Sequence, residues 1–102
     1  MYNEELNFKV SSEKDANGTC KQGMIDTDYS LIVKYLGEPV ILNGDKSQAE
    51  WVIEFEDGVI ATLYDWKESI AKETVTLWTI GGNSKKAVRY LECIIPQYIR
   101  ID

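Results

Sequence analysis

The segment from Glu50 to Trp66 constrains the fold of this chain more than any other part of it. Its first half alternates large apolar side chains with other residues, which is the period of a β-strand with one buried face. The dipeptide Asp57-Gly58 follows and is typical of a tight hairpin turn. A second alternating run, from Val59 to Trp66, returns after the turn. The segment therefore predicts an antiparallel hairpin whose buried face carries Trp51, Ile53 and Phe55.

Two helices are predicted, one on each side of this hairpin in the sequence. Residues 28–36 carry apolar side chains at helical spacing after the N-cap candidates Thr27 and Asp28, and Gly37 with Pro39 provides a stop signal. A second helix is expected after Asn83 or Ser84, and Pro96 ends it. The apolar positions are Tyr29, Ile32, Val33 and Leu36 in the first helix and Ala87, Val88, Leu91, Ile94 and Ile95 in the second.

The expected fold class is α+β. Residues 75–80 are predicted to add a third strand, which gives a three-stranded antiparallel meander with two helices packed on one face. Residues 6–10 or 98–101 would supply an extra short strand at one end. Residues 11–23 are polar and are expected to form a loop or a loose hairpin around Asn17-Gly18. The 102 residues fit a single domain, 1–102, of which residues 1–26 are the least regular part.

The chain is acidic, with 11 Lys and Arg against 17 Asp and Glu and a formal net charge of −6. Phosphate contacts need Lys and Arg, so this balance argues against direct nucleic-acid binding and against an anionic membrane surface. Between Glu50 and Glu73, seven carboxylates and two lysines give a net charge of −5. Such a segment is either an ordinary solvated surface or a face that fits a basic surface of another protein.

Aromatic residues lie close to these carboxylates in the sequence. Tyr64, Trp66 and Trp78 are candidates for the sheet face opposite the buried one, where exposed aromatic side chains would indicate an interface. Packing inside a small domain is the competing role for them. The residues predicted to bind a partner are Glu50, Glu54, Glu56, Asp57, Tyr64, Asp65, Trp66, Glu68 and Trp78.

A second candidate site is the segment 81–86, where two glycines precede the predicted helix start and two lysines follow it. Backbone N–H groups at a helix start can bind an anion. The spacing is not that of a Walker loop, and glycines that end a strand before a helix also have a purely structural role. The candidate anion-binding residues are Gly81, Gly82, Asn83, Ser84, Lys85 and Lys86.

No catalytic residue, metal site or cofactor is expected from the composition. The chain has no histidine, and its two cysteines, Cys20 and Cys93, are far apart in the sequence. Histidine-dependent nucleophilic schemes and the usual Cys/His zinc sites are therefore excluded. Carboxylate pairs remain, but those near Asp57 flank a tight turn, where solvated side chains are usual. A protein that is not an enzyme is expected.

The first residues, Met1–Glu5, have no basic region followed by an apolar run, so no signal peptide is expected. No apolar stretch approaches the roughly 20 residues of a membrane span. The chain is expected to act in the cytoplasm of a bacterial cell.

Three segments of the chain follow a distinctive pattern. Residues 49–58 read A-E-W-x-I-x-F-x-D-G, residues 61–67 read A-T-x-Y-D-W-K, and residues 78–82 read W-x-I-G-G. This pattern resembles that of a group of small phage-encoded proteins, mostly uncharacterised, and the resemblance covers residues 36–90. It implies a phage accessory setting rather than a particular reaction. Where the resemblance leads us to expect histidine after the last tryptophan, this chain has Thr79, so a role that needs an imidazole there is not expected.

Size, acidity and the phage-like pattern lead to one main hypothesis. The chain would be a phage accessory protein that inhibits a host factor, such as an anti-defence (anti-CRISPR) inhibitor whose acidic face covers a basic nucleic-acid-binding site. Its partner would be a host protein with a basic surface. Two alternatives stay open: a protein that sequesters a small ligand or nucleotide signal through residues 81–86, and a small enzyme that uses carboxylates.

Overall fold

The computed structural model describes residues 7–10, 19–42, 48–65 and 71–97. The predicted α+β class is confirmed. In chain order the elements are β1 (Phe8–Val10), β2 (Cys20–Asp26), α1 (Tyr29–Leu36), β3 (Ile41–Leu42), β4 (Ala49–Phe55), β5 (Ile60–Tyr64), a 3-10 helix (Lys72–Thr74), β6 (Leu77–Gly82) and α2 (Lys86–Ile94). The strand predicted over residues 98–101 lies outside the described residues.

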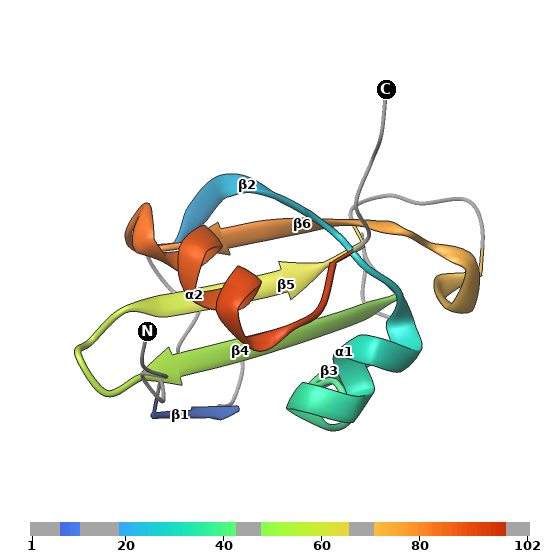
Figure 1. Cartoon of the computed structure of the whole chain (residues 1–102), viewed down its shortest axis with the longest axis horizontal. Helices are drawn as coiled ribbons and strands as arrows, with labels where there is room; N and C mark the ends of the chain where they lie inside the picture. The colour runs from blue at the N-terminus through green and yellow to red at the C-terminus, as the bar shows by residue number, and fades with distance from the viewer. Residues whose placement is uncertain (1–6, 11–18, 43–47, 66–70, 98–102) are drawn as a thin grey trace.

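The strands form one antiparallel sheet in the order β1-β4-β5-β6-β2, running from bottom to top in Figure 1. The predicted meander is its centre, β4-β5-β6. β1 lies within residues 6–10, where an extra short strand was expected, and pairs with β4. The sheet is larger than predicted because β2 pairs with β6 and β3 pairs with β4. Phe8 lies opposite Phe55 at the end of β4, whereas Leu42 lies opposite Ala49 at its start.

The loop prediction for residues 11–23 is wrong at its described end, because Cys20 already belongs to β2. Backbone pairing with β6 forms this strand although its sequence does not alternate. The register shifts between Lys21 and Gly23, which interrupts the period of two that a pattern search detects. The proposed turn at Asn17-Gly18 lies outside the described residues.

The hairpin prediction is confirmed in detail. Trp51 and Ile53 are fully buried, and Phe55 is 3% exposed. At the turn, the Asp57 carboxylate accepts a hydrogen bond from the Val59 N–H at 3.1 Å. Gly58 has a φ of 93°, which side chains disfavour, so glycine suits this position.

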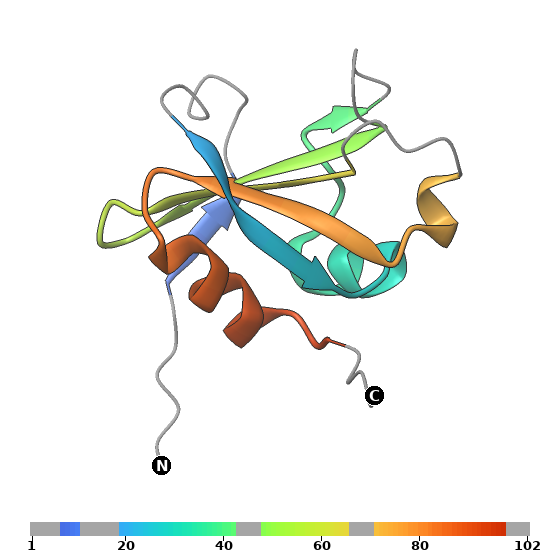
Figure 2. The same cartoon turned by 90° about the horizontal axis from the view of Figure 1, so that it is seen from above.

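Both helices lie on the same face of the sheet, as predicted (Figure 2). Asp28 caps α1 by accepting a hydrogen bond from the Leu31 N–H at 2.9 Å, and Gly37, with a φ of 85°, ends it. The apolar stripes of both helices were predicted correctly. Their core-facing residues are Ile32 and Leu36, which are buried in α1, and Ala87, Leu91 and Ile95, which are buried in or just after α2.

An aromatic cluster joins α1 to the sheet. The rings of Trp51 and Trp78 meet edge to face with centroids 5.7 Å apart, and Tyr29 packs against both. The indole of Trp51 donates to the Gly37 carbonyl at 2.9 Å, and that of Trp78 donates to the Val75 carbonyl at 3.2 Å. Because both indole N–H groups are satisfied, the two rings can be fully buried without an unpaired polar group.

Candidate functional site

The sheet has a second face, opposite the helices, which we call the outer face. Its residues alternate with the core residues along each strand, and no described helix packs over it (Figure 2). Its members are Lys9 in β1, Glu50, Val52 and Glu54 in β4, Ile60, Thr62 and Tyr64 in β5, Leu77, Thr79 and Gly81 in β6, and Lys21, Met24 and Asp26 in β2.

One row of side chains crosses four strands of the outer face. The register places Glu50 opposite Tyr64, Tyr64 opposite Thr79, and Thr79 opposite Met24. Neighbouring strands lie about 4.8 Å apart, so the row spans about 14 Å. Residues that are far apart in the chain are thus brought together on one surface.

Exposure differs along this face. The short side chains of Val52, Thr62 and Thr79 are buried, with exposed fractions of 0%, 2% and 6%. The longer side chains of Glu50, Glu54, Ile60 and Tyr64 are half-buried. Met24 and Leu77 are each 39% exposed. What the outer face offers to a partner is therefore a set of carboxylates, one phenol, several apolar groups and, at its edges, the lysines Lys9 and Lys21.

The carboxylates near the hairpin turn have local partners. Glu54 forms an ion pair with Lys9 at 3.4 Å, and both side chains are substantially exposed. Glu56 is exposed and accepts a hydrogen bond from the Asn7 side chain at 3.1 Å. Exposed pairs of this kind contribute little to stability, so they leave the carboxylates able to exchange partners.

Tyr64 lies between the carboxylate of Glu50 and β6. Partial burial raises the pKa of its phenol, and the nearby Glu50 carboxylate and Cys20 thiol raise it further. The phenol therefore keeps its proton at neutral pH. The face thus presents a neutral hydroxyl, which can both donate and accept, beside an acidic group.

Asp57 connects the hairpin turn to α2. The Tyr90 hydroxyl donates to its carboxylate at 2.6 Å, and the Tyr90 ring packs edge to face on Phe55. The bond from Tyr90 lowers the pKa of Asp57, with smaller contributions from the Val59 N–H and Lys86. The same bond raises the pKa of Tyr90. Asp57 is therefore a structural residue as well as an exposed one.

Substitution of Tyr90 by phenylalanine should make stability less dependent on pH. The lowered pKa of Asp57 stabilises the fold at pH values above the ordinary aspartate pKa of 3.8. This contribution is lost as the pH falls through the folded-state pKa. The raised pKa of Tyr90 stabilises the fold at pH values below the ordinary tyrosine pKa of 10.0. This contribution is lost as the pH rises through the folded-state pKa. In urea unfolding, the wild type should have a higher free energy of unfolding than Tyr90→Phe between about pH 5 and 9, and this difference should shrink on either side.

Tyr35→Phe is the matched control for that experiment, because Tyr35 is an exposed tyrosine on α1. Its stability should follow the wild-type pH dependence. If the difference in the free energy of unfolding between the wild type and Tyr90→Phe stays constant from acid to alkaline pH, the role assigned to the Asp57–Tyr90 bond is contradicted.

Two of the predicted partner-binding residues are buried, so those predictions are wrong. Trp78 is fully buried, because it lies opposite Ile25 on the helix-covered face and packs against Trp51. Asp65 is 1% exposed, because backbone and side-chain N–H groups enclose its carboxylate. Neither side chain can form part of a surface.

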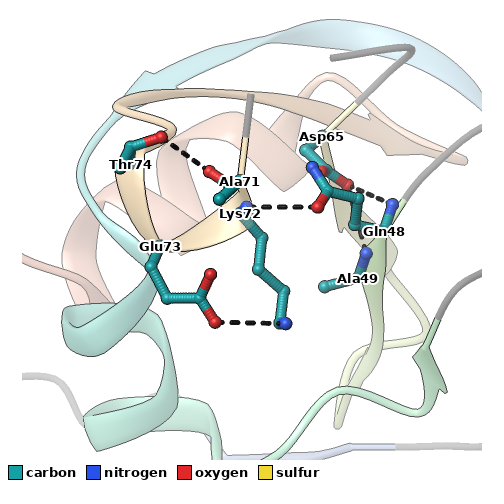
Figure 3. Close-up of polar contacts among 7 residues, drawn as sticks. All are labelled: Gln48, Ala49, Asp65, Ala71, Lys72, Glu73 and Thr74. Carbon is teal, nitrogen blue, oxygen red and sulfur yellow. Dashed lines mark hydrogen bonds and ion pairs between the residues drawn. The ribbon is translucent and has the colours of Figure 1, made fainter. Parts of the chain in front are cut away.

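Asp65 instead forms the centre of a buried hydrogen-bond cluster at the start of β4 (Figure 3). One of its oxygens accepts from the Gln48 N–H at 2.8 Å and the Ala49 N–H at 3.1 Å, and the other accepts from the Gln48 side chain at 2.9 Å. The side-chain amide oxygen of Gln48, Oε1, in turn accepts from the Lys72 N–H at 3.2 Å. The cluster holds together the start of β4, the end of β5 and the 3-10 helix.

Trp66 and Glu68 lie outside the described residues. Of the nine predicted partner-binding residues, Glu50, Glu54, Glu56, Asp57 and Tyr64 therefore have a described position at or near the outer face or its turn. Met24 and Leu77 also lie on the outer face and were not among the predicted residues. Leu77 could have been found by extending the alternation of Trp78 and Ile80 backwards, whereas Met24 had no such signal.

The glycines of segment 81–86 have the structural role that the sequence allowed beside anion binding. Both belong to β6, which ends at Gly82. A Cβ on Gly81 would lie 2.4 Å from the Thr62 hydroxyl, and one on Gly82 would lie 2.7 Å from the Ile60 carbonyl. Close approach of the neighbouring strand therefore accounts for both glycines.

The polar groups of this segment are used within the fold. The Asn83 side chain accepts from the Ile60 N–H and donates to the Gly58 carbonyl. The Ser84 hydroxyl accepts from the Lys86 N–H at 3.1 Å. Lys85 and Lys86 are exposed. The N–H groups that an anion would need are thus partly occupied by the protein itself.

Most described residues of the three motif segments serve the fold. The tryptophans form the aromatic cluster, Asp57 and Gly58 form the turn, Asp65 holds the start of β4, and the paired glycines admit the neighbouring strand. Glu50 and Tyr64 are the described motif residues that lie partly exposed on the outer face. They form a cross-strand pair on that face.

Within the part of the chain that the structure describes, no cluster of His, Cys, Asp and Glu could hold a metal ion. Among the same residues, no helix has the length and apolar character to cross a bilayer.

Comparisons with models of known protein families, with curated protein sequences and with solved structures found no match.

Proposed function

We propose that this chain is a non-enzymatic accessory protein that binds a basic surface of another protein and keeps nucleic acid away from it. The observation that supports this proposal most is the position of Glu50 and Glu54 on the outer face, with Glu56 and Asp57 at the adjoining turn. Glu54 and Glu56 lie about 7 Å apart along the chain, which is less than a Debye length, so an approaching cationic surface experiences their combined field.

The setting that we propose is the one implied by the sequence pattern: a phage protein that acts in the bacterial cytoplasm on a host nucleic-acid-binding factor, such as a defence effector. Charge complementarity of this kind mainly raises the rate of association and fixes orientation. It also suits competition with nucleic acid, because carboxylates would occupy the lysines and arginines that otherwise contact phosphates.

The alternative in which residues 81–86 capture a small anionic ligand has less support. Its glycines are explained by strand packing, and the Lys86 N–H is bonded to Ser84. Lys86 also contributes to lowering the pKa of Asp57, so part of its field is directed at a carboxylate of the same chain.

Charge reversal separates the two functions. The double variant Glu50→Lys/Glu56→Lys should associate about tenfold or more slowly with the partner at about 0.1 M salt, and the difference should shrink as salt rises. The partner would first be captured from bacterial lysate on the immobilised wild-type chain, and the rates would then be measured by surface plasmon resonance with nucleic acid as competitor.

The matched control is Glu38→Lys/Glu92→Lys, which changes the net charge equally at exposed positions beyond α1 and on α2. It should associate faster than the outer-face variant. Loss of binding in a folded Lys85→Glu/Lys86→Glu variant, together with normal binding by Glu50→Lys/Glu56→Lys, would overturn the proposal.

A further inference from the structure

The outer face carries two exposed apolar side chains, next to Asp26, that the charge argument leaves unused. Met24 on β2 lies opposite Thr79, and Leu77 lies two residues before Thr79 on the same face of β6. Each residue is 39% exposed. Met24 belongs to the edge strand β2, and Leu77 belongs to the neighbouring strand β6. We call Met24 and Leu77 the apolar end.

The apolar end is continuous with the acidic residues. The row that begins at Met24 passes through Thr79 and Tyr64 and reaches Glu50 on β4, a span of about 14 Å. A single protein surface patch covers such a distance easily, because stable interfaces bury about 800 Å² on each partner. One partner can therefore contact both ends at once.

We propose that the partner presents an exposed apolar side chain next to its lysines and arginines, and that the apolar side chain docks on Met24 and Leu77. This inference rests on the proposed function and adds the second half of the recognition chemistry. Carboxylates would draw the cations to Glu50 and Glu54, and the apolar contact would then slow dissociation, because burial of apolar surface acts on the lifetime of a complex.

A second copy of this chain is a poorer occupant of the same face. A two-fold axis that passed near Glu50 and Glu54 would bring the carboxylates of the two copies together. The chain already has a net charge of −6, so each copy repels the other before contact. A basic partner is instead attracted to Glu50 and Glu54.

Two synthetic peptides test the inference without knowledge of the natural partner. One is lysine-rich and also carries leucines; the other has the same length and charge, with glycine in place of each leucine. Titration into the isotopically labelled full chain, followed by amide NMR shifts, should place both peptides at Glu50 and Tyr64. The leucine peptide should bind about tenfold or more tightly and should also shift Met24 and Leu77.

The variant Met24→Ser/Leu77→Ser should bind both peptides equally, at the affinity of the glycine peptide. Its control is Tyr35→Ser/Leu42→Ser, which removes two other exposed apolar side chains, on α1 and β3, and should keep the tenfold preference. The spectrum of each variant reports whether it is folded. All these results together would support the inference.

Equal binding of the two peptides to the wild type, or a preference that survives Met24→Ser/Leu77→Ser, would overturn it. If the glycine peptide still binds the carboxylates in a salt-sensitive manner, only this inference fails. If neither peptide shifts outer-face residues, the proposed acidic-face function fails with it.

Discussion

Replacement of Phe55 by alanine is expected to lower the free energy of unfolding by about 3–5 kcal/mol. Phe55 is 3% exposed and packs between Phe8, with ring centroids 5.9 Å apart, and Tyr90, with centroids 4.8 Å apart. The loss combines the transfer energy of the ring with the cavity left between β1, β4 and α2, which neighbouring backbone cannot fill. For a domain of this size, such a loss is a large part of the total stability.

Urea denaturation followed by tryptophan fluorescence would measure this change. Tyr35→Ala removes a ring that is 42% exposed and should change stability by about 0.5 kcal/mol or less. A cost below about 1 kcal/mol for Phe55→Ala would contradict the packing of β4 described above.

Replacement of Asp65 by alanine is expected to cost about 2–4 kcal/mol, which is large for a single polar residue. The change removes the acceptor of two backbone N–H groups, those of Gln48 and Ala49, and of the Gln48 side chain. Ala49 is fully buried, so water cannot easily replace the lost carboxylate at its N–H. Each buried donor left unsatisfied costs about 1–3 kcal/mol.

Asp65→Asn is the informative companion to that variant. The amide keeps the shape and one acceptor oxygen, which can serve the two backbone N–H groups, but its NH₂ faces the donor side chain of Gln48. Its cost should therefore lie between those of the wild type and Asp65→Ala. Equal stability of all three proteins in urea would show that the cluster does not hold the start of β4.

The central part of the fold was predictable from the sequence because its signals are local. Alternation from Glu50 to Tyr64 and the Asp57-Gly58 turn specify the hairpin within a short stretch of chain. The N-cap at Asp28 and the stop at Gly37 specify α1 in the same way. In these segments the residues that decide the structure are close neighbours, so a pattern is sufficient.

The edge strand β2 was not predictable because its signal is not local. The close packing of Val88 of α2 accounts for Gly23, because a Cβ at this position would lie 2.9 Å from the Val88 side chain. The shifted register near Gln22 also breaks the alternation of polar and apolar residues. The partner of β2 is β6, which lies far along the chain, and no local pattern reveals it.

The candidate site was predicted in part for the same reason. Alternation places Glu50, Glu54 and Tyr64 on one face, and the structure has them there. Alternation could not show that Asp65 is buried, because its hydrogen-bond donors belong to Gln48 and Ala49. Alternation groups Trp78 with Ile80, but it does not show that this face is the covered one, which follows from the packing of Trp78 against Trp51.

The two edge strands of the sheet, β1 and β2, come from the N-terminal part of the sequence, and this order matters during translation. β2 leaves the ribosome long before Gly82, which lies opposite Cys20, has been synthesised. For most of that time it is a strand without its neighbour, exposed to other nascent chains. Its composition, Cys-Lys-Gln-Gly-Met-Ile-Asp, includes two charges and a glycine and is a poor nucleus for aggregation. The weak strand character that conceals β2 from sequence patterns therefore protects the growing polypeptide until β6 emerges.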